Sequence, residues 1–247
     1  MQNAVLHDDI QGASGISPAG GLRPMFDTAW RLSRNVAARL VHGVLAAALV
    51  LPSTSPAFAQ SPLPQGGTVA SGAATITTTS PSAMTIDQTS SRGIINWNTF
   101  SIGQGASVTF RQPGPDAATL NRVTGQTGSS IAGRLSGNGQ VFLVNPNGIA
   151  ITPTGTVQLG GGFVASTLDI TNADFNAGRL TFSGGSGSAG VVNAGRIAVG
   201  SGGFAALLGA SVDNDGDVSV PMGRIGLGAG GQATLDLSGD GFLQIAV

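Results

Sequence analysis

The stretch Gly139–Ile151, GQVFLVNPNGIAI, sets two apolar runs on either side of a four-residue turn. Asn145-Pro146-Asn147-Gly148 is typical of a type I β-turn, because Pro146 presets φ at the second position and Gly148 adopts conformations that other residues resist. The side chain of Asn145 can accept a hydrogen bond from the backbone beyond it, and Asn147 tolerates the third position of the turn. The stretch therefore predicts two short strands that meet at a fixed corner.

Short strands of this kind recur along the chain, separated by Gly and Asn turns. Alternating apolar residues, rich in β-branched types, indicate strands rather than helices. The segments that we expect to be strands are Thr68–Ser71, Ala74–Thr77, Met84–Asp87, Ser107–Phe110, Val157–Leu159 and Ile197–Val199. The sequence therefore predicts an all-β domain.

Internal repeats distinguish a solenoid from other all-β folds. Asn193–Val199 recurs as Asn214–Val220, 21 residues later, and Gly161–Ala165 recurs as Gly202–Ala206, 41 residues later. These spacings fit one and two turns of a single coil.

We interpret the repeats, which include a match of Arg196–Leu207 with Arg224–Leu235, as a right-handed parallel β-helix. Asn-x-Gly before an apolar run favours a corner, because Asn and Gly both tolerate positive φ. With about 20 residues per rung, the domain should have about nine rungs and a length of about 40 Å. The alternative is a glycine-rich sandwich whose repeats are accidental.

The first 59 residues have the pattern of a long signal peptide. A cluster of arginines precedes the apolar run Leu40–Leu51, which is too short to span a bilayer comfortably. An Ala-x-Ala signal at Ala57 and Ala59 predicts cleavage by signal peptidase before Gln60. The alternatives are an N-terminal membrane anchor and a buried helix.

The rest of the chain divides into two parts by composition. Residues 60–66 are a predicted linker, and residues 67–247 are the predicted β-helix domain. The chain ends at Gly241–Val247, inside what resembles another strand. We therefore expect a truncated or fragmentary form of a longer exported protein.

The composition after the leader excludes most enzyme chemistries. Residues 60–247 carry nine Asp and seven Arg, a net charge of −2, and no Glu, Lys, Tyr, Cys or His. Without His or Cys, there is no Ser-His-Asp or Cys-His nucleophile and no His- or Cys-ligated metal. The charge balance provides no electrostatic footprint for nucleic acid. We predict no catalytic residue, no cofactor, no metal site and no nucleic-acid partner.

Three motifs resemble known binding loops. Gly185–Gly190 and Gly226–Gly231 match the dinucleotide fingerprint, but no helix-forming stretch follows either of them. Asp213–Asp217, DNDGD, begins like a calcium loop, but Val218 stands where that loop needs Gly. We favour an Asp-rich corner between two rungs over a calcium site. Catalysis by Asp and Arg, as in β-helical polysaccharide lyases and hydrolases, is a further alternative.

A family resemblance rests on five segments that occur in a fixed order. They are Ile94–Gly103, Leu120–Gly125, Ile131–Leu135, Gly137–Ile149 and Val164–Leu168. This ordered set resembles the filamentous haemagglutinin-type two-partner secretion domain over roughly residues 66–240. The ordered set is specific, whereas any single piece is not.

The resemblance implies a right-handed β-helix of the pectin lyase-like class with an N-terminal cap. It also implies that the chain crosses the inner membrane through the Sec translocon and is then recognised in the periplasm by an outer-membrane barrel with POTRA domains. The protein would be the secretion module of a haemagglutinin or adhesin, secreted or held at the surface of a Gram-negative bacterium. The alternative is a stand-alone β-helix that binds or cleaves polysaccharide.

The resemblance also assigns roles to particular residues. In this family an Asn-Pro-Asn-Gly turn belongs to the secretion determinant, which implies that role for Asn145–Gly148 here. Many members have a second turn, Asn-Pro-Asn-Leu, which this sequence lacks. Asn121 and Arg122 lie in the corresponding region and are the possible second determinant.

An unfolded, strand-rich chain exposes segments that can pair with other strands. We hypothesise that Val141–Val144 is exposed and pairs with a strand of the transporter. The hypothesis predicts that Val141→Lys combined with Phe142→Asp abolishes binding to the transporter.

Overall fold

The computed structural model describes residues 61–184, 189–238 and 241–246. The predicted signal peptide and its cleavage site at Ala57, Ala59 and Gln60 lie outside these residues, as does most of Gly185–Gly190. Within the described ranges, no helix is long and apolar enough to cross a membrane.

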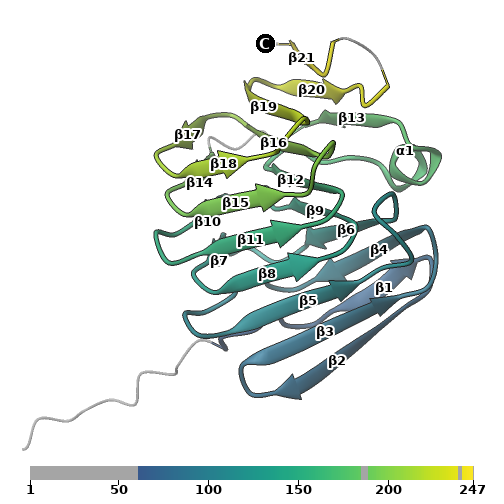
Figure 1. The fold of residues 1–247 in the computed structure, drawn as a ribbon, viewed down its shortest axis with the longest axis vertical. Helices are drawn as coiled ribbons and strands as arrows, with labels where there is room; N and C mark the ends of the chain where they lie inside the picture. Colours follow the sequence, from purple (N-terminus) through teal and green to yellow (C-terminus); the bar gives the residue numbers. More distant parts are fainter. Residues whose placement is uncertain (1–60, 185–188, 239–240, 247) are drawn as a thin grey trace, which may run out of the picture. The chain divides into compact units, whose positions relative to one another are not determined.

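The described chain winds into coils whose strands stack into three sheets (Figure 1). Sheet A contains, in spatial order, β1 (Thr68–Ser71), β4 (Arg92–Trp97), β6 (Ala118–Val123), β9 (Gln140–Val144), β12 (Gly162–Ser166), β16 (Phe204–Gly209) and β19 (Arg224–Ala229). Sheet B contains β18 (Asp217–Ser219), β15 (Arg196–Val199), β11 (Thr156–Leu159), β8 (Arg134–Gly137), β5 (Ser107–Arg111), β3 (Ala83–Gln88) and β2 (Ala74–Ser80). Sheet C contains β17 (Val212–Asn214), β14 (Val191–Asn193), β10 (Ile149–Ile151) and β7 (Ser129–Ile131).

A further layer covers the outer face of sheet A. It consists of α1 (Asn172–Ala177) and of sheet D, the antiparallel strands β13 (Leu180–Ser183), β20 (Gln232–Leu235) and β21 (Leu243–Ala246). We call α1 and sheet D, with the segments that join them to the coils, the outer layer.

The predicted parallel β-helix is confirmed. All six segments that we expected to be strands lie in strands of the structure. The N-terminal cap is present as well, because β1 pairs antiparallel with β4 and β2 pairs antiparallel with β3, whereas the strands that follow in these sheets pair in parallel.

The predicted nine rungs are wrong. In the described part of the chain, sheet A holds six strands that pair in parallel. Gly162 of β12 pairs directly with Phe204 of β16, 42 residues later, so the 41-residue repeat spans one coil and not two. The extra length of that coil contains α1 and β13. The residues of this coil that enter the outer layer therefore make it about as long in sequence as two ordinary coils.

One repeat is structural and another is accidental. Asn193 pairs with Asn214 and Arg196 with Asp217 on neighbouring coils, so the 21-residue repeat is one turn. The match of Arg196–Leu207 with Arg224–Leu235 is accidental, because the aligned residues lie in different sheets. Arg196 begins a strand of sheet B, whereas Arg224 begins a strand of sheet A.

The mechanism proposed for the Asn-x-Gly corners also needs correction. Neither Gly195 nor Gly216 has a positive φ. A Cβ on Gly195 would lie 2.4 Å from the carbonyl oxygen of Thr152, on the neighbouring coil. The amide of Asn193 donates to Oδ1 of Asn214 over 2.7 Å. Glycine is therefore needed for the close approach of stacked coils, and the asparagines form a ladder between them.

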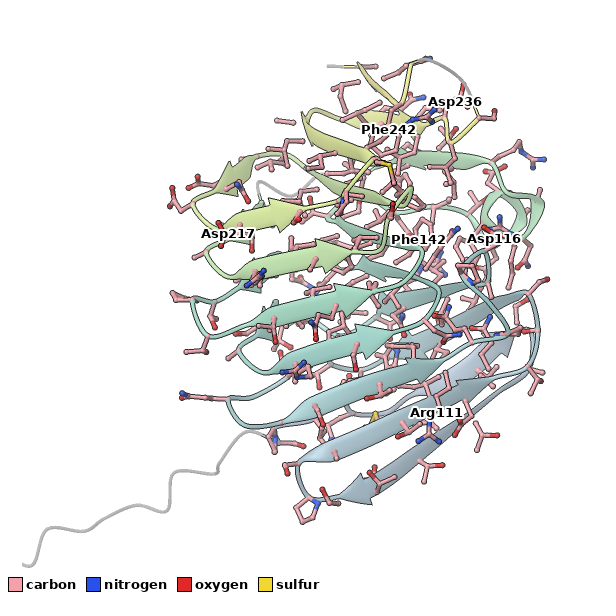
Figure 2. All side chains as sticks on the ribbon, in the orientation of Figure 1. Arg111, Asp116, Phe142, Asp217, Asp236 and Phe242 are labelled. Carbon is pink, nitrogen blue, oxygen red and sulfur yellow. The ribbon has the colours of Figure 1, made fainter. Side chains whose placement is uncertain are left out.

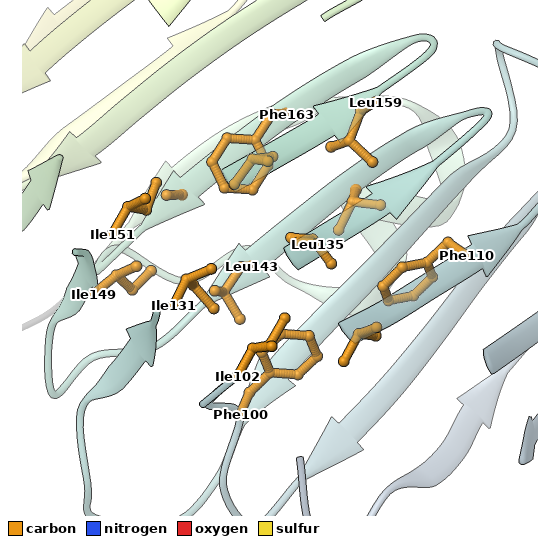
Figure 3. Close-up of a cluster of buried hydrophobic side chains, with 14 of the residues drawn as sticks. Phe100, Ile102, Phe110, Ile131, Leu135, Leu143, Ile149, Ile151, Leu159 and Phe163 are labelled. Atoms are coloured by element: carbon orange, nitrogen blue, oxygen red, sulfur yellow. The ribbon is translucent and has the colours of Figure 1, made fainter. Parts of the chain in front are cut away.

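The continuous apolar run of β9 is explained by two cores. Val141 and Leu143 point into the coils, where Leu143 and Phe163 pack with other apolar side chains (Figure 3). Phe142 and Val144 point outward and pack under the outer layer. Because both faces of sheet A are covered at β9, this strand lacks the polar alternation of a half-exposed sheet.

The predicted linker is packed against the domain where the structure describes it. Leu63 is buried in the inner core, and Gln65 forms a backbone bridge with Thr99. Residues 61–66 therefore do not act as a free tether.

Met222 adopts a strained conformation that glycine would relieve. It has φ of 53° and is 90% exposed, so its side chain contributes little packing. Gly202 occupies the matching corner one coil earlier, with φ of 78°. We expect Met222→Gly to raise the free energy of unfolding by about 0.5–1 kcal/mol in urea titrations. Gly202→Ala, the matched control, should lower it by about 1 kcal/mol, and equal signs for the two would contradict the strain.

Candidate functional site

The predicted turn at Asn145–Gly148 is present at the corner between sheets A and C. The N–H of Gly148 donates to the carbonyl of Asn145 over 3.1 Å, which closes the turn. Oδ1 of Asn145 accepts from the backbone N–H of Asn147 over 2.9 Å, as expected. Asn147 has no positive φ, whereas Gly148 has φ of 106°. These dihedrals favour type I over type II, which needs a positive φ at the third residue.

Hydrogen bonds from Asn145 fix this corner to the coil before it. Its Nδ2 donates to the carbonyl of Thr127 over 3.0 Å and to Oγ of Ser129 over 2.9 Å. Its backbone N–H donates to Ser166 on the following coil over 2.9 Å. Asn145 is fully buried. Its role in the folded domain is therefore to join three successive coils.

The two central residues of the turn face solvent. Pro146 and Asn147 are exposed, and Gly148 is half-buried. Nδ2 of Asn147 donates to the carbonyl of Gly125 over 2.9 Å, which orients the exposed amide along the corner. Of the four predicted residues, only Pro146 and Asn147 thus present whole side chains to a partner.

A second proline turn, which the sequence analysis missed, lies close by. Thr152-Pro153-Thr154-Gly155 closes with a 2.8 Å bond from the N–H of Gly155 to the carbonyl of Thr152. Pro153 and Thr154 are exposed. The x-Pro-x-Gly pattern could have identified this turn. It lacks the two amide side chains and therefore serves as an internal comparison for Asn145–Gly148.

Asn121 and Arg122, predicted as one possible determinant, face opposite sides of sheet A. Asn121 is fully buried inside the coil, where Oδ1 accepts from Nε1 of Trp97 over 3.0 Å. Its amide donates to the carbonyl of Phe142 over 3.3 Å. Arg122 points outward, because successive residues of a strand alternate between faces. The two side chains therefore cannot form one contact surface in the folded domain.

Arg122 holds the start of the outer layer. Its guanidinium donates to Asp169 over 2.8 Å and to Oδ1 of Asn172 over 2.6 Å, and it also bonds the carbonyl of Ile170. Its side chain is only 15% exposed. Arg122 also lies beside Val144, the residue before the turn, in the pairing of β6 with β9. The corner and the outer layer thus meet at this arginine.

The helix of the outer layer is capped at both ends, and the sequence analysis did not predict it. Oγ1 of Thr171 accepts from the N–H of Asp174, and Gly178 ends the helix in the left-handed conformation. Hydrogen bonds from Thr171 and Arg179 hold the pKa of Asp174 below its usual value. The Thr-x-x-Asp pattern is a capping signal that could have identified this helix.

Phe175 attaches this helix to sheet A. Its ring meets that of Phe142, labelled in Figure 2, edge to face at a centroid distance of 5.3 Å. The guanidinium of Arg92 lies 5.2 Å from the Phe175 ring and donates to the Phe175 carbonyl over 2.9 Å. Burial lowers the pKa of Arg92. An aromatic pair and a cation therefore fasten the helix at its centre.

The hypothesis that Val141–Val144 pairs with the transporter concerns the unfolded chain and stays a prediction, because the folded domain does not expose this segment. All four side chains are fully buried, and β9 is paired with β6 on one edge and with β12 on the other. The double substitution Val141→Lys and Phe142→Asp would place charges in both cores. Loss of transporter binding in that variant would therefore report unfolding.

The remaining motifs do not build sites in the described residues. No group of three or more His, Cys, Asp or Glu that could hold a metal occurs among them. Asp217 pairs in register with Arg196, as expected for a corner between coils. Gly226 and Gly228 lie in a strand whose face packs against Leu243 and Ile245, so Gly226–Gly231 is not a dinucleotide loop.

Comparisons with known proteins agree on one family. A family model described as the TPS secretion domain matches residues 60–244. A heme/hemopexin-binding protein of Haemophilus influenzae is 35% identical over 194 residues, which is 75% of this chain and 21% of that protein. A second Haemophilus influenzae protein of the same name is 39% identical over 127 residues, 51% of this chain and 14% of that protein. This chain thus spans about a fifth or less of the length of these relatives.

A solved structure supports the same grouping. The HMW1 secretion domain from Haemophilus influenzae superposes with a TM-score of 0.65 and 40% sequence identity, covering 70% of this chain and 46% of that one.

Proposed function

This chain belongs to the TPS secretion domain family, and from that premise we propose that its Asn145–Gly148 corner is the part recognised during export. The domain is a secretion-signal module of an exoprotein, and its family implies a cognate outer-membrane transporter. We further propose that residues 1–59 direct the chain through the Sec translocon and are cut before Gln60 by signal peptidase. POTRA domains of the transporter then bind the module in the periplasm.

The proposed outcome of export is an adhesin-like protein that is secreted or held at the surface of a Gram-negative cell. The ligand of such a protein would be bound outside residues 67–247, the β-helix domain. We propose no catalytic role for this domain.

One observation carries the assignment to the corner: an exposed Pro146-Asn147 pair sits on a turn that buried Asn145 holds rigid. A rigid, exposed feature loses little conformational freedom on binding, which favours recognition. Asn145 would then act by positioning its two neighbours.

Arg122 and Asn121 receive different proposed roles. Arg122 positions the outer layer next to the corner, through its bonds to Asp169 and Asn172. Asn121 stabilises the coil interior through Trp97. Neither is proposed to contact the transporter.

Heme binding, named for the two relatives, is not proposed for this domain. Proteins ligate heme iron through His, Cys, Met or Tyr. Residues 61–247 contain no His, Cys or Tyr, and their methionines are the buried Met84 and the strained Met222. We propose that heme binding in those relatives belongs to portions that this chain does not match.

The test compares the two proline turns in an export assay. Pro146→Ala with Asn147→Ala should reduce transporter-dependent release of the chain into the medium at least tenfold. Pro153→Ala with Thr154→Ala, the matched control, should leave release unchanged. Both variants keep Asn145 and Thr152, so we expect unfolding midpoints close to that of the wild type. If both variants were released as efficiently as the wild type in the presence of the transporter, Asn145–Gly148 would be only a structural corner.

A further inference from the structure

The backbone N–H groups of the Asn145–Gly148 turn are all used inside the domain. The N–H of Asn145 donates to a carbonyl on the following coil, and the N–H of Gly148 donates to the carbonyl of Asn145. Oδ1 of Asn145 accepts the N–H of Asn147 over 2.9 Å. Pro146 has no N–H. A partner that approaches this turn therefore meets no backbone donor.

The side-chain amides of the turn use their N–H groups inside the domain as well. Nδ2 of Asn145 donates to Thr127 and Ser129. Nδ2 of Asn147 donates to the carbonyl of Gly125 over 2.9 Å and to Oδ1 of Asn145 over 3.1 Å. Because an amide nitrogen carries two hydrogens, neither side chain has a donor left for a partner.

The same hydrogen bonds fix which way each amide points. Oδ1 of Asn145 accepts a backbone N–H, and its Nδ2 faces the carbonyl of Thr127, so this amide has one possible orientation. Nδ2 of Asn147 then faces two oxygens, the Asn145 Oδ1 and the Gly125 carbonyl. The opposite orientation would set oxygen against oxygen at both contacts. Oδ1 of Asn147 is therefore the end of the amide that is turned away from these neighbours.

Three acceptor atoms of the turn receive no hydrogen bond from the residues that the structure describes. They are the carbonyl oxygens of Pro146 and Asn147, and Oδ1 of Asn147. The carbonyl of Asn147 faces the preceding coil, because its oxygen lies 3.2 Å from the position of a Cβ on Gly128. Pro146 and Asn147 are both exposed. The turn therefore presents acceptors, and no donors, to a partner.

The other proline turn, Thr152–Gly155, differs in this respect. The N–H of Gly155 closes that turn, as the N–H of Gly148 closes the first one. The N–H of Thr154, however, donates to no acceptor within the described part of the chain. No side chain in that turn does what Oδ1 of Asn145 does in the first. The acceptor-only surface is thus a property of the Asn-Pro-Asn-Gly sequence and not of proline turns in general.

The acceptors belong to a stretch of chain with little charge. From Val123 to Leu168, Arg134 is the only charged residue, and it lies on β8 in sheet B. The nearest carboxylate along the chain, that of Asp169, is paired with Arg122. Recognition of the turn therefore depends on hydrogen bonding to neutral groups.

We propose that the transporter recognises this turn through hydrogen-bond donors, which it places against Oδ1 of Asn147 and the carbonyl of Pro146. An acceptor of the partner, such as a carboxylate, would find no N–H at this surface and would lose its water without compensation. The proposal rests on the proposed function, because it concerns the same turn and the same partner. It adds the chemistry of the contact, which the proposed function leaves open.

Three substitutions of one exposed residue test the proposal as a matched set: Asn147→Asp, Asn147→Leu and Asn147→Lys. All three remove Nδ2, so each loses the same bonds to Gly125 and Asn145. They differ in what they present to a partner, which is an acceptor for the aspartate, neither group for the leucine and a donor for the lysine.

Binding of each purified full chain to its cognate transporter, purified in detergent, gives the measurement. The aspartate variant should bind about fivefold or more tightly than the leucine variant, as expected for one recovered hydrogen bond. The lysine variant should bind no more tightly than the leucine variant. Thr154→Asp and Thr154→Lys, at the matching position of the other proline turn, should bind as the wild type does. Equal unfolding midpoints for the three Asn147 variants are the control for folding.

The salt dependence of the aspartate variant distinguishes two sources of the donor. A cationic donor, from arginine or lysine, would attract the added charge, so raising the salt concentration should weaken this variant more than the wild type. A neutral N–H or O–H donor should give both proteins the same salt dependence. Both results support the proposal when the aspartate variant binds more tightly than the leucine variant.

The outcomes separate this proposal from the proposed function. Equal binding by the three Asn147 variants, or tighter binding by the lysine variant than by the aspartate variant, would overturn recognition through donors. If all three bind equally, and about tenfold or more weakly than the wild type, the proposed function stands and Asn147 acts through its Nδ2 bonds. If all three bind as the wild type does, and Pro146→Ala with Asn147→Ala is released normally, both proposals fall.

Discussion

Replacing Asn145 by alanine should lower the free energy of unfolding by about 2–4 kcal/mol. The substitution leaves the carbonyl of Thr127 and the hydroxyl of Ser129 without their donor, and the N–H of Asn147 without its acceptor. Because Asn145 and Ser129 are both buried, water cannot replace the bond between them without opening the corner. Equilibrium urea unfolding, followed by circular dichroism, measures the change.

Thr152→Ala, at the first position of the other proline turn, is the control. Its hydroxyl makes two long bonds, of 3.4 Å to the carbonyl of Ile131 and of 3.3 Å to the exposed hydroxyl of Thr154, and Thr152 is half-buried. We expect a loss below about 1 kcal/mol. An Asn145→Ala variant that was exported as efficiently as the wild type would contradict the positioning role.

Replacing Phe142 by alanine should lower the free energy of unfolding by about 3–5 kcal/mol. The ring is fully buried between sheet A and the outer layer, next to Phe175 at 5.3 Å and Phe204 at 6.2 Å. Its removal leaves a cavity directly under α1. Urea unfolding gives the global loss, and amide hydrogen exchange should show reduced protection of α1 in particular.

Leu143→Ala provides the matched control, because the neighbouring side chain points into the coils. It should cost about 2–5 kcal/mol as well, but α1 should keep its local protection relative to the strands. Identical exchange patterns for the two variants would show that sheet A and the outer layer behave as one core.

Much of the fold could be predicted from local sequence patterns. The strands at Thr68–Ser71 and Ser107–Phe110 follow from alternation, and the 21-residue repeat from Asn193 to Asn214 identified a true coil. The turn at Asn145–Gly148 formed as expected, because proline and glycine dictate its dihedrals whatever surrounds them. Patterns of this kind act over a few residues and are therefore legible in the sequence.

The candidate site was only partly predictable. The sequence located the turn but did not show which of its residues are accessible. In the structure Asn145 is buried and joins coils, whereas Pro146 and Asn147 face solvent. Likewise, Asn121 and Arg122 are neighbours in sequence and lie on opposite faces of a strand. Exposure depends on which coil stacks above and below, and a single sequence does not show that stacking.

By itself, the sequence determined that this chain is a β-helix with a rigid Asn-Pro-Asn-Gly corner and with almost no ionisable chemistry. Only the tertiary structure decided the number of coils, because Gly162 pairs with Phe204 across an excursion that carries α1 and β13. It also decided that Val141–Val144 is buried on both faces, since the outer layer that covers Phe142 comes from segments far along the chain. The physical reason is that strand pairing and core burial join residues that are distant in sequence, whereas turns and strand propensities depend on near neighbours.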